Sequence, residues 1–444
     1  MAFGGLELLR AEIADVGAVR PVGRVFEIGR GTIEVSGLSA RAALGDRALI
    51  RAQSGKKIGA EVIALRRGAV TLLGDSAVEG VAIGDLVEVT GQAGIAPDSS
   101  WIGRIVDPFG RPLDGRPLLR GTEEHDLRAH PPAATLRGRL GARVETGMAV
   151  FNTLLPLVRG QRIGLFAGSG VGKSSLLAKF ARGVSADVVV IALIGERGRE
   201  LREFVERVLG PEGMARSVIV AATSDQSPLV RRRCAWAAMS VAEYFRDRGQ
   251  HVLFLADSVT RFAEAHREVA LAAGEPPSLR GYPPSTAHQI MSLAERSGPG
   301  PEGTGDITAV FSVLVAGSDM EEPVADILRG TLDGHVVLDR AIAERGRFPA
   351  IDLLRSVSRS LPEAASPPEN ELIASARKLL GAYDRAEMMI QAGLYTPGSD
   401  PLIDAAIRVW PALDAFIALD EPQDSFNSFR QLAAALAPAK PPQR

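Results

Sequence analysis

A glycine-rich loop between an apolar run and a helical stretch constrains the fold of this chain more than any other feature. Residues 167–175 read Ala-Gly-Ser-Gly-Val-Gly-Lys-Ser-Ser and complete the apolar run at 162–167. Three glycines allow the backbone to curl so that successive amide N–H groups point inward at anionic oxygens. The helix that follows adds the positive end of its dipole. This order of strand, loop and helix predicts a phosphate-binding loop.

The loop residues have separate expected roles. Lys173 supplies a positive charge for the β- and γ-phosphates, and the Ser174 hydroxyl is placed to ligate Mg²⁺. Ala167 takes the first position of the motif, where glycine is usual, with a side chain small enough to fit. We therefore expect ATP and Mg²⁺ as ligands. The residues expected to bind the nucleotide along the loop are Ala167, Gly168, Ser169, Gly170, Val171, Gly172, Lys173, Ser174 and Ser175.

Two acidic residues follow buried-strand runs and are the candidates for hydrolysis. Asp257 comes after the apolar run at 252–256, and Glu196 follows the run at 188–194. Because open α/β sheets bind ligands at the carboxyl ends of their strands, both carboxylates are expected beside the phosphates. Asp257 is interpreted as the acid on the Mg²⁺ side, acting through water. Glu196 is interpreted as the group that orients the attacking water, with a solvated loop acid as the alternative.

Composition limits the class of protein. The chain has 444 residues, 46% of them hydrophobic and 23% charged, with a formal net charge of −2. That length suits two or three domains, and the charge provides no basic field of the kind that nucleic-acid-binding proteins use. No apolar run reaches the roughly 18–20 residues of a membrane-spanning helix, and the N-terminus does not read as a signal peptide. We therefore expect a cytoplasmic protein, with its single cysteine, Cys234, buried in a helix.

The pattern along the chain divides it into four segments. Residues 1–21 are expected to form an amphipathic helix, which either packs on its own domain or docks a partner. Residues 22–93 predict a small β-barrel, and residues 94–362 predict an α/β domain with a mostly parallel sheet. Residues 363–444 have helical periodicity and end in a tail expected to be disordered. The barrel strands are expected at 23–28, 32–35, 47–51, 59–65, 69–73 and 86–90, and the sheet strands at 162–167, 188–194, 217–221, 251–256, 307–315 and 335–338.

Five further motifs carry a resemblance to a known family. The chain resembles the type III secretion ATPases, which are relatives of the catalytic subunit of rotary ATP synthases. The similarity extends from residue 103 to residue 401, and within the family the flagellar export ATPase is the preferred assignment. It implies that the α/β domain is RecA-like. The motifs lie at 195–204, 257–262, 274–277, 280–285 and 356–359.

The resemblance also implies roles for individual residues. Glu196 matches the family's catalytic glutamate, and Arg197 and Arg261 match arginines near the γ-phosphate. Phe348 matches the aromatic residue that stacks on adenine. Arg359 matches an arginine finger that a neighbouring subunit contributes in trans; without the resemblance, a surface salt bridge would be the preferred interpretation. A guanidinium in that position can stabilise charge on the transferring phosphoryl group.

The resemblance further implies an assembly and its partners. The functional unit would be a homohexamer that hydrolyses ATP to power export of flagellar proteins, delivered as chaperone–substrate complexes. A negative regulator would bind the N-terminal helix, and a stalk-like protein would occupy the pore of the ring. The ring would lie in the cytoplasm, peripherally associated with an export gate at the membrane.

Alternatives remain open at this point. An injectisome-type secretion ATPase would share the same site chemistry. A ring-shaped nucleic-acid translocase would need a basic, aromatic-rich groove, and the barrel segment offers few aromatics. A non-catalytic nucleotide-binding subunit is opposed by the presence of Lys173 and Glu196. The segment 285–296 departs from the family pattern, and the run Arg231-Arg232-Arg233 is interpreted as a solvated or interface charge cluster.

Overall fold

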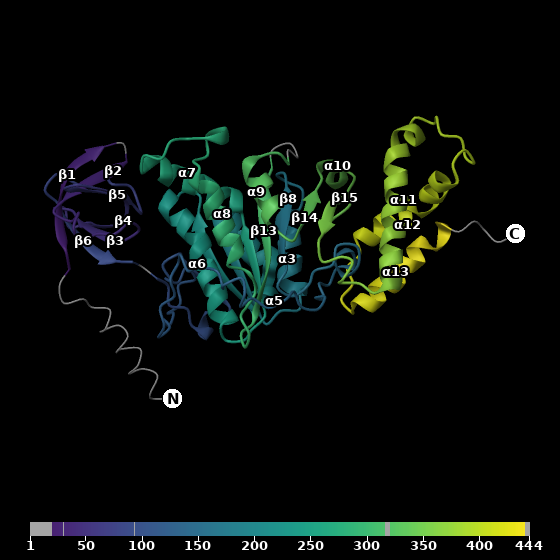
Figure 1. The fold of residues 1–444 in the computed structure, drawn as a ribbon, viewed down its shortest axis with the longest axis horizontal. Coiled ribbons are helices and arrows are strands. Elements are labelled where there is room, and N and C mark those ends of the chain that lie inside the picture. The colour runs from purple at the N-terminus through teal and green to yellow at the C-terminus, as the bar shows by residue number, and fades with distance from the viewer. Residues whose placement is uncertain (1–19, 30, 93, 316–319, 440–444) are drawn as a thin grey trace.

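The computed structural model describes residues 20–439, except residues 30, 93 and 316–319. A β-barrel, an α/β domain and a group of C-terminal helices follow one another along the longest axis (Figure 1). The expected fold class is therefore confirmed. The predicted helix at 1–21 lies outside the described residues, apart from its last two positions. No helix among the described residues is long and apolar enough to cross a membrane.

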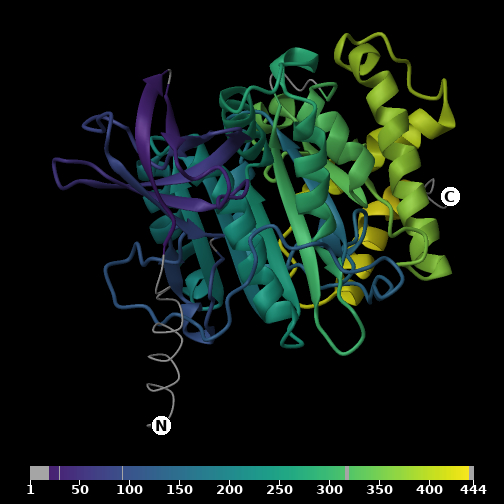
Figure 2. The same cartoon turned by 60° about the vertical axis from the view of Figure 1, so that its left-hand side comes forward.

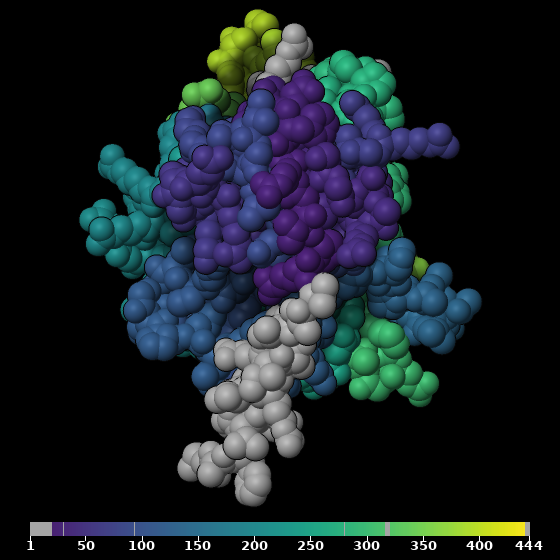
Figure 3. Space-filling view, turned by 90° about the vertical axis from the view of Figure 1, so that its left-hand side faces the viewer, coloured from purple at the N-terminus to yellow at the C-terminus, as the bar shows by residue number. Residues whose placement is uncertain are grey.

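The barrel is closed by antiparallel strands in the order β1-β2-β5-β4-β3-β6. Side chains alternate along β2, so that Ile33 and Val35 enter the barrel core while their neighbours remain partly exposed. The barrel covers one end of the molecule (Figure 3). Each predicted strand is present within two residues of its expected ends: β1 (Val22–Gly29), β2 (Thr32–Ser36), β3 (Arg47–Arg51), β4 (Lys57–Arg66), β5 (Ala69–Gly74) and β6 (Leu86–Gly91).

The α/β domain is built on a sheet with the order β15-β14-β8-β13-β11-β9-β10-β7, and β12 pairs with β13. The strands from β14 to β7 in this order are parallel, whereas β15 and β12 are antiparallel to their neighbours. The expectation of a mostly parallel sheet is confirmed. The strands are β7 (Arg104–Val106), β8 (Arg162–Ala167), β9 (Val188–Glu196), β10 (Ser217–Thr223), β11 (Val252–Asp257), β12 (Gly298–Pro299), β13 (Asp306–Leu314), β14 (Gly334–Leu338) and β15 (Ile351–Ser358).

Helices cover both faces of this sheet. Alternation along β9 sends Ile191 and Leu193 into one hydrophobic core and Val190 and Ala192 into another. Burying each of the larger side chains, Val190, Ile191 and Leu193, contributes roughly 1.5–3 kcal/mol. The helices are α2 (Ala149–Asn152), α3 (Lys173–Gly183), α4 (Gly198–Glu203), the π-helical turn Phe204–Leu209, α5 (Gly210–Met214), α6 (Pro228–Arg246), α7 (Val259–Ala272), α8 (Ser285–Glu295), α9 (Pro323–Thr331) and α10 (Arg340–Glu344), with short 3₁₀ turns at Ser99–Trp101 and Leu279–Gly281.

The C-terminal helices lie at the end of the sheet opposite the barrel (Figure 2). Pro367 begins the first of them, and the preceding Ser366 N–H donates to Glu369 Oε2 at 2.7 Å, which satisfies one amide at the helix start. Their apolar faces continue the core that also contains α3. They are α11 (Pro367–Gln391), α12 (Pro401–Ile417), α13 (Ser425–Leu436) and the 3₁₀ turn Ala437–Ala439.

The arginine run at 231–233 joins the barrel to the α/β domain. Arg232 and Arg233 are 6% and 5% exposed, so their interpretation as a solvated cluster is wrong and the interface alternative holds. Arg232 Nη2 donates to Glu61 Oε1 of β4 at 2.8 Å, and burial lowers the pKa of Arg232 to about 10. Cys234, on the same helix, is fully buried as expected.

Candidate active site

The phosphate loop connects β8 to α3 as the sequence predicts. Gly170 and Gly172 have φ angles of 77° and 87°, a conformation that glycine adopts without a steric cost. Helix α3 then begins at Lys173. A Cβ atom on Gly172 would lie 3.1 Å from Cδ1 of Phe348, so this position also lacks room for a side chain. The loop amides and the helix start form a cradle for phosphate oxygens.

Lys173 and Asp257 meet at the carboxyl end of the sheet. Lys173 follows β8 and its loop, and Asp257 ends β11; strand β13 lies between these two strands in the sheet. The Lys173 ammonium forms an ion pair with the Asp257 carboxylate across β13. Ser312 of β13 donates its hydroxyl to Asp257 Oδ1 at 2.8 Å. Asp257 is only 3% exposed, so these two partners replace the contacts that its side chain would make with water. The two residues that the sequence placed at different strand ends are therefore in direct contact.

Glu196 is the last residue of β9 and faces the same space. A pocket of about 240 Å³ is lined by Ser174, Glu196 and Asp257, with Glu200 and apolar residues of α4 and the following turn on its other side. Burial raises the pKa of Glu196 to about 7, and the charge of Asp257 adds to the effect while Lys173 opposes it. A carboxyl group that titrates near neutral pH can accept a proton from water or position it.

The two arginines expected near the γ-phosphate differ in placement. Arg261 lies in the first turn of α7, and its Cβ lies 3.5 Å from a Cβ built on Gly195, beside Glu196. Its guanidinium pairs with Glu264 at 3.3 Å. The Arg197 side chain is 78% exposed and pairs with Glu200 at 3.2 Å. Arg261 therefore lies at the site, whereas Arg197 points outward at its rim.

Phe348 lies against the phosphate loop on the other side. Its ring contacts the Gly172 position and remains 49% exposed. The residue follows α10, in the connection from that helix to β15. A half-exposed aromatic ring at the edge of a phosphate cradle offers a flat apolar surface to a nucleotide base.

Arg359 does not belong to the site of its own chain. Strand β15 is antiparallel to β14, and its last residue, Ser358, pairs with Gly334, the first residue of β14. Because β14 is parallel to β8, Arg359 lies where β8 begins, and the phosphate loop lies where β8 ends. Six residues of strand separate these two edges by about 20 Å. The structure brings the other predicted residues together, with Arg197 at the rim, and leaves Arg359 on the opposite edge.

Two further residues of the site were not predicted. Ser312 is a polar residue inside the apolar strand at 307–315, and that contrast could have drawn attention to it. Glu200 lies four residues beyond Glu196, and its carboxyl group raises the pKa of Glu196 further. Its position in the motif at 195–204 gave a signal, but only the folded chain shows the two carboxyl groups facing one another.

Two regions of the chain match domains of known protein families. The nucleotide-binding domain of the ATP synthase alpha/beta family matches residues 147–358, and the C-terminal domain of the type III secretion ATPase EscN matches residues 365–437. Fold and site thus define an ATP-hydrolysing enzyme of the ATP synthase alpha/beta class, with ATP as substrate.

Relatives that match nearly the whole chain identify the family within this class. The flagellum-specific ATP synthase of Caulobacter vibrioides is 45% identical over 96% of this chain and 99% of its own length. That of Salmonella typhimurium is 42% identical over 93% of this chain and 92% of its own. The assembled EscN of enteropathogenic E. coli superposes with a TM-score of 0.86 at 37% identity, covering 94% of this chain and 100% of EscN. The chain belongs to the type III secretion ATPase family, which includes the flagellum-specific ATP synthases.

Proposed function

We propose that this chain hydrolyses Mg²⁺-bound ATP in a homohexameric ring and thereby energises export of flagellar proteins. The observation that carries the catalytic part is the ion pair of Lys173 with Asp257 beside a pocket that Asp257 and Glu196 both line. The pKa of Glu196, near 7, suits a group that manages a proton at physiological pH. The named full-length relatives support the flagellar part.

The residues present fit a magnesium ion bound together with the nucleotide. Ser174 and Asp257 offer a hydroxyl and a carboxylate to the same pocket, and hard oxygen donors of this kind suit Mg²⁺. The described residues contain no group of three or more His, Cys, Asp and Glu that could hold a metal unaided. Such a site therefore relies on phosphate oxygens as ligands. The bound ion would neutralise charge on the β- and γ-phosphates.

Each protein group then has a defined task. Lys173 leaves Asp257 when phosphates arrive and contacts their oxygens, while the loop amides hold them in place. Glu196, in its carboxylate form, orients a water molecule toward the γ-phosphorus. Arg261 stands beside it as a second cation, and Phe348 stacks on the adenine ring. Arg197, at the rim, approaches the γ-phosphate only if its side chain turns inward from Glu200.

Arg359 acts on the site of a neighbouring subunit. Its position, about 20 Å from the phosphate loop of its own chain, supports action in trans. An arginine finger contributes roughly 10³–10⁵ in turnover by stabilising charge on the transferring phosphoryl group. The assembled state of EscN in its solved structure supports a ring for this chain as well.

The proposed partners follow from the family. EscN has been solved in complex with its central stalk EscO, which supports a stalk-like protein in the pore of this ring. A negative regulator at the N-terminal helix, chaperone–substrate complexes and an export gate would be the other partners. The ring would work in the cytoplasm, on the inner face of the membrane that carries the gate.

Glu196→Gln tests the catalytic assignment. The variant should bind ATP with normal affinity, because the loop amides and Lys173 remain, but its turnover should be lost. Fluorescent-nucleotide binding and phosphate release measure the two properties on the same sample. Glu206→Gln is the matched control, since Glu206 lies on the turn after α4 and pairs with Arg202 at the surface, away from the phosphates. Wild-type turnover in Glu196→Gln would refute the role of Glu196.

The injectisome alternative is favoured by one observation, the structural similarity to EscN at 37–38% identity. The flagellum-specific relatives reach 45% over nearly the whole chain, which favours the flagellar assignment. Loss of swimming with retained effector secretion after deletion of the gene would distinguish the two systems.

A further inference from the structure

The backbone at the base of Arg359 is fixed to the residue that precedes β14. The Arg359 N–H donates to the carbonyl oxygen of Asp333 at 2.9 Å. The Gln161 side-chain amide donates to the same oxygen at 3.1 Å and to Ser358 Oγ at 3.0 Å. Next to it, a Cβ on Gly334 would lie 2.5 Å from the carbonyl oxygen of Val357, so the two strands approach more closely than a side chain would allow. The Arg359 side chain therefore extends from a backbone position that is held by several hydrogen bonds and close strand packing.

Asp333 is in turn held by the first residue of β8. Arg162 donates from its backbone N–H and from Nε to Asp333 Oδ2, at 3.0 Å and 3.1 Å, and from Nη2 to Oδ1 at 3.2 Å. The Asp333 N–H donates back to the Arg162 carbonyl oxygen at 2.8 Å. Bidentate arginine–carboxylate pairs of this kind fix orientation as well as distance. Asp333 thus connects the base of Arg359 to the strand that carries the phosphate loop.

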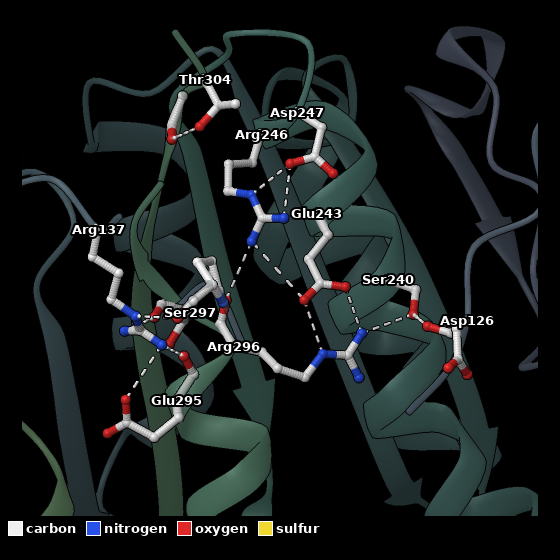
Figure 4. A network of polar contacts seen from close by, with 12 residues as sticks. Asp126, Arg137, Ser240, Glu243, Arg246, Asp247, Glu295, Arg296, Ser297 and Thr304 are labelled. Carbon is white, nitrogen blue, oxygen red and sulfur yellow. Dashed lines mark hydrogen bonds and ion pairs between the residues drawn. The ribbon is translucent and has the colours of Figure 1, made fainter. Parts of the chain in front are cut away.

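A second carboxylate extends the connection to α8. Arg162 Nη1 lies 2.8 Å from Glu295 Oε1, at the last residue of that helix. Glu295 is also paired with Arg137 at 3.4 Å, and the next residue, Arg296, donates through Nε to Glu243 of α6 at 2.9 Å (Figure 4). Arg296 is 2% exposed, so the end of α8 is anchored in the body of the domain. Glu295 is therefore an ion-pair partner of Arg162 on an anchored helix end.

The guanidinium of Arg359 is exposed, whereas its backbone is fixed. The side chain is exposed, and its Nη2 donates only to the carbonyl oxygen of Arg329, at 3.2 Å, among the hydrogen bonds of the described residues. A rigid base with an exposed guanidinium is the arrangement needed to present a cation to another molecule in a fixed direction.

We propose that Asp333, Arg162 and Glu295 are positioning residues that hold Arg359 in the direction required by the neighbouring subunit's active site. The inference rests on the proposed action of Arg359 in trans. Strand β8 then serves two sites at once. Its carboxyl end carries the phosphate loop of its own subunit, and its amino end supports the finger lent to the neighbour. A misdirected finger should lower the rate of the chemical step and leave nucleotide binding unchanged.

Mixed rings test the inference, because they separate the subunit that lends the finger from the subunit that receives it. Glu196→Gln subunits keep Arg359 but cannot turn over, and Arg359→Ala subunits keep an intact site but lend no finger. Together they should recover activity at interfaces where the first serves the second. Asp333→Asn keeps the shape of the side chain and removes its charge. In the Glu196→Gln subunit it should reduce the recovered kcat by about tenfold or more, with KM for ATP unchanged.

The same Asp333→Asn change placed in the Arg359→Ala subunit should leave the recovered activity intact, since that subunit lends no finger. Asp114→Asn is the matched control in either subunit. It removes another bidentate arginine–aspartate pair, to Arg104, with side chains 12% and 13% exposed, beside β7 at the other edge of the sheet. Glu295→Gln in the finger-lending subunit is the second variant, chosen because the Glu295 side chain is 41% exposed and its replacement should leave folding intact. It should lower kcat in the same direction.

Two results would overturn the positioning role: equal losses from both placements of Asp333→Asn, or no loss when Asp333→Asn and Glu295→Gln are each placed in the finger-lending subunit. Ring formation is checked by mass photometry in every mixture. Should Asp333→Asn subunits fail to enter rings, the Glu295→Gln result decides. Failure of the parent pair to recover activity in rings shown to be mixed would instead refute Arg359 in trans, and the inference with it.

Discussion

Replacing Glu196 with glutamine should stabilise the nucleotide-free protein above neutral pH while it abolishes turnover. The physical reason is the raised pKa of Glu196, which reaches about 7 because the carboxyl group is buried near Asp257. The folded state therefore holds a proton that the unfolded state has already released at pH 6. Stability falls as pH rises from the unfolded pKa, near 4.5, through the folded pKa. Glutamine carries no charge and avoids this loss.

The size of the effect follows from the shift. The shift from 4.5 to about 7 corresponds to about 3.5 kcal/mol at about 1.4 kcal/mol per pKa unit, as an upper bound. Glu196 is partly exposed at the pocket, and screening by solvent reduces the expected value to about 1–2 kcal/mol. The difference between variant and wild type should be small below pH 4.5, where Glu196 is protonated in both states. It should reach its full value by pH 8.

Urea unfolding of both proteins at pH 5, 6, 7 and 8 measures the difference, with tryptophan fluorescence as the signal from Trp101 and Trp236 of the α/β domain. Glu203→Gln provides a control, because Glu203 lines the same pocket but is not among the main groups that shift the pKa of Glu196. A Glu196→Gln protein that is less stable than wild type at pH 8, or whose advantage does not change with pH, would refute the explanation of the pKa.

Two other substitutions have expected outcomes. Phe348→Ala should raise KM for ATP about 5- to 160-fold with a smaller effect on kcat, because stacking on a base is worth about 1–3 kcal/mol. Steady-state kinetics with an unchanged KM would remove Phe348 from the nucleotide site. Glu61→Ala should destabilise the junction of barrel and α/β domain by about 3–5 kcal/mol, since Arg232, with a side chain 7% exposed, would lose its carboxylate partner. Thermal unfolding measures this loss, and a Tm equal to that of wild type would contradict the buried pairing.

The sequence predicted the parts of the fold that produce strong local patterns. Strands β8 and β3 have the expected bounds, because apolar runs or strict alternation end at glycine or charged residues. Strand β15 was not predicted. It lies at the edge of the sheet, and exposed positions such as Leu354, Arg355 and Val357 interrupt its buried pattern. Strand β7 has three residues, too few for a period to be visible.

In the site, too, features set by local sequence were predictable and contacts between distant residues were not. The phosphate loop and the acids at strand ends were predictable, because chain order alone places them at one edge of the sheet. Contacts between distant residues were not. The burial of Arg232 depends on Glu61, which lies 171 residues away, and the hydroxyl on Asp257 comes from Ser312 in a strand inserted between those of Lys173 and Asp257. Such partners are set by tertiary packing.

In the proposed ring, each site hydrolyses ATP only with Arg359 of a neighbouring subunit. ATPase rate per subunit is measured against protein concentration, beside the oligomer distribution from mass photometry. Activity per subunit should rise steeply over the concentrations at which the hexamer forms, and the monomer should have almost none. A stable monomer with a full, concentration-independent rate would contradict it.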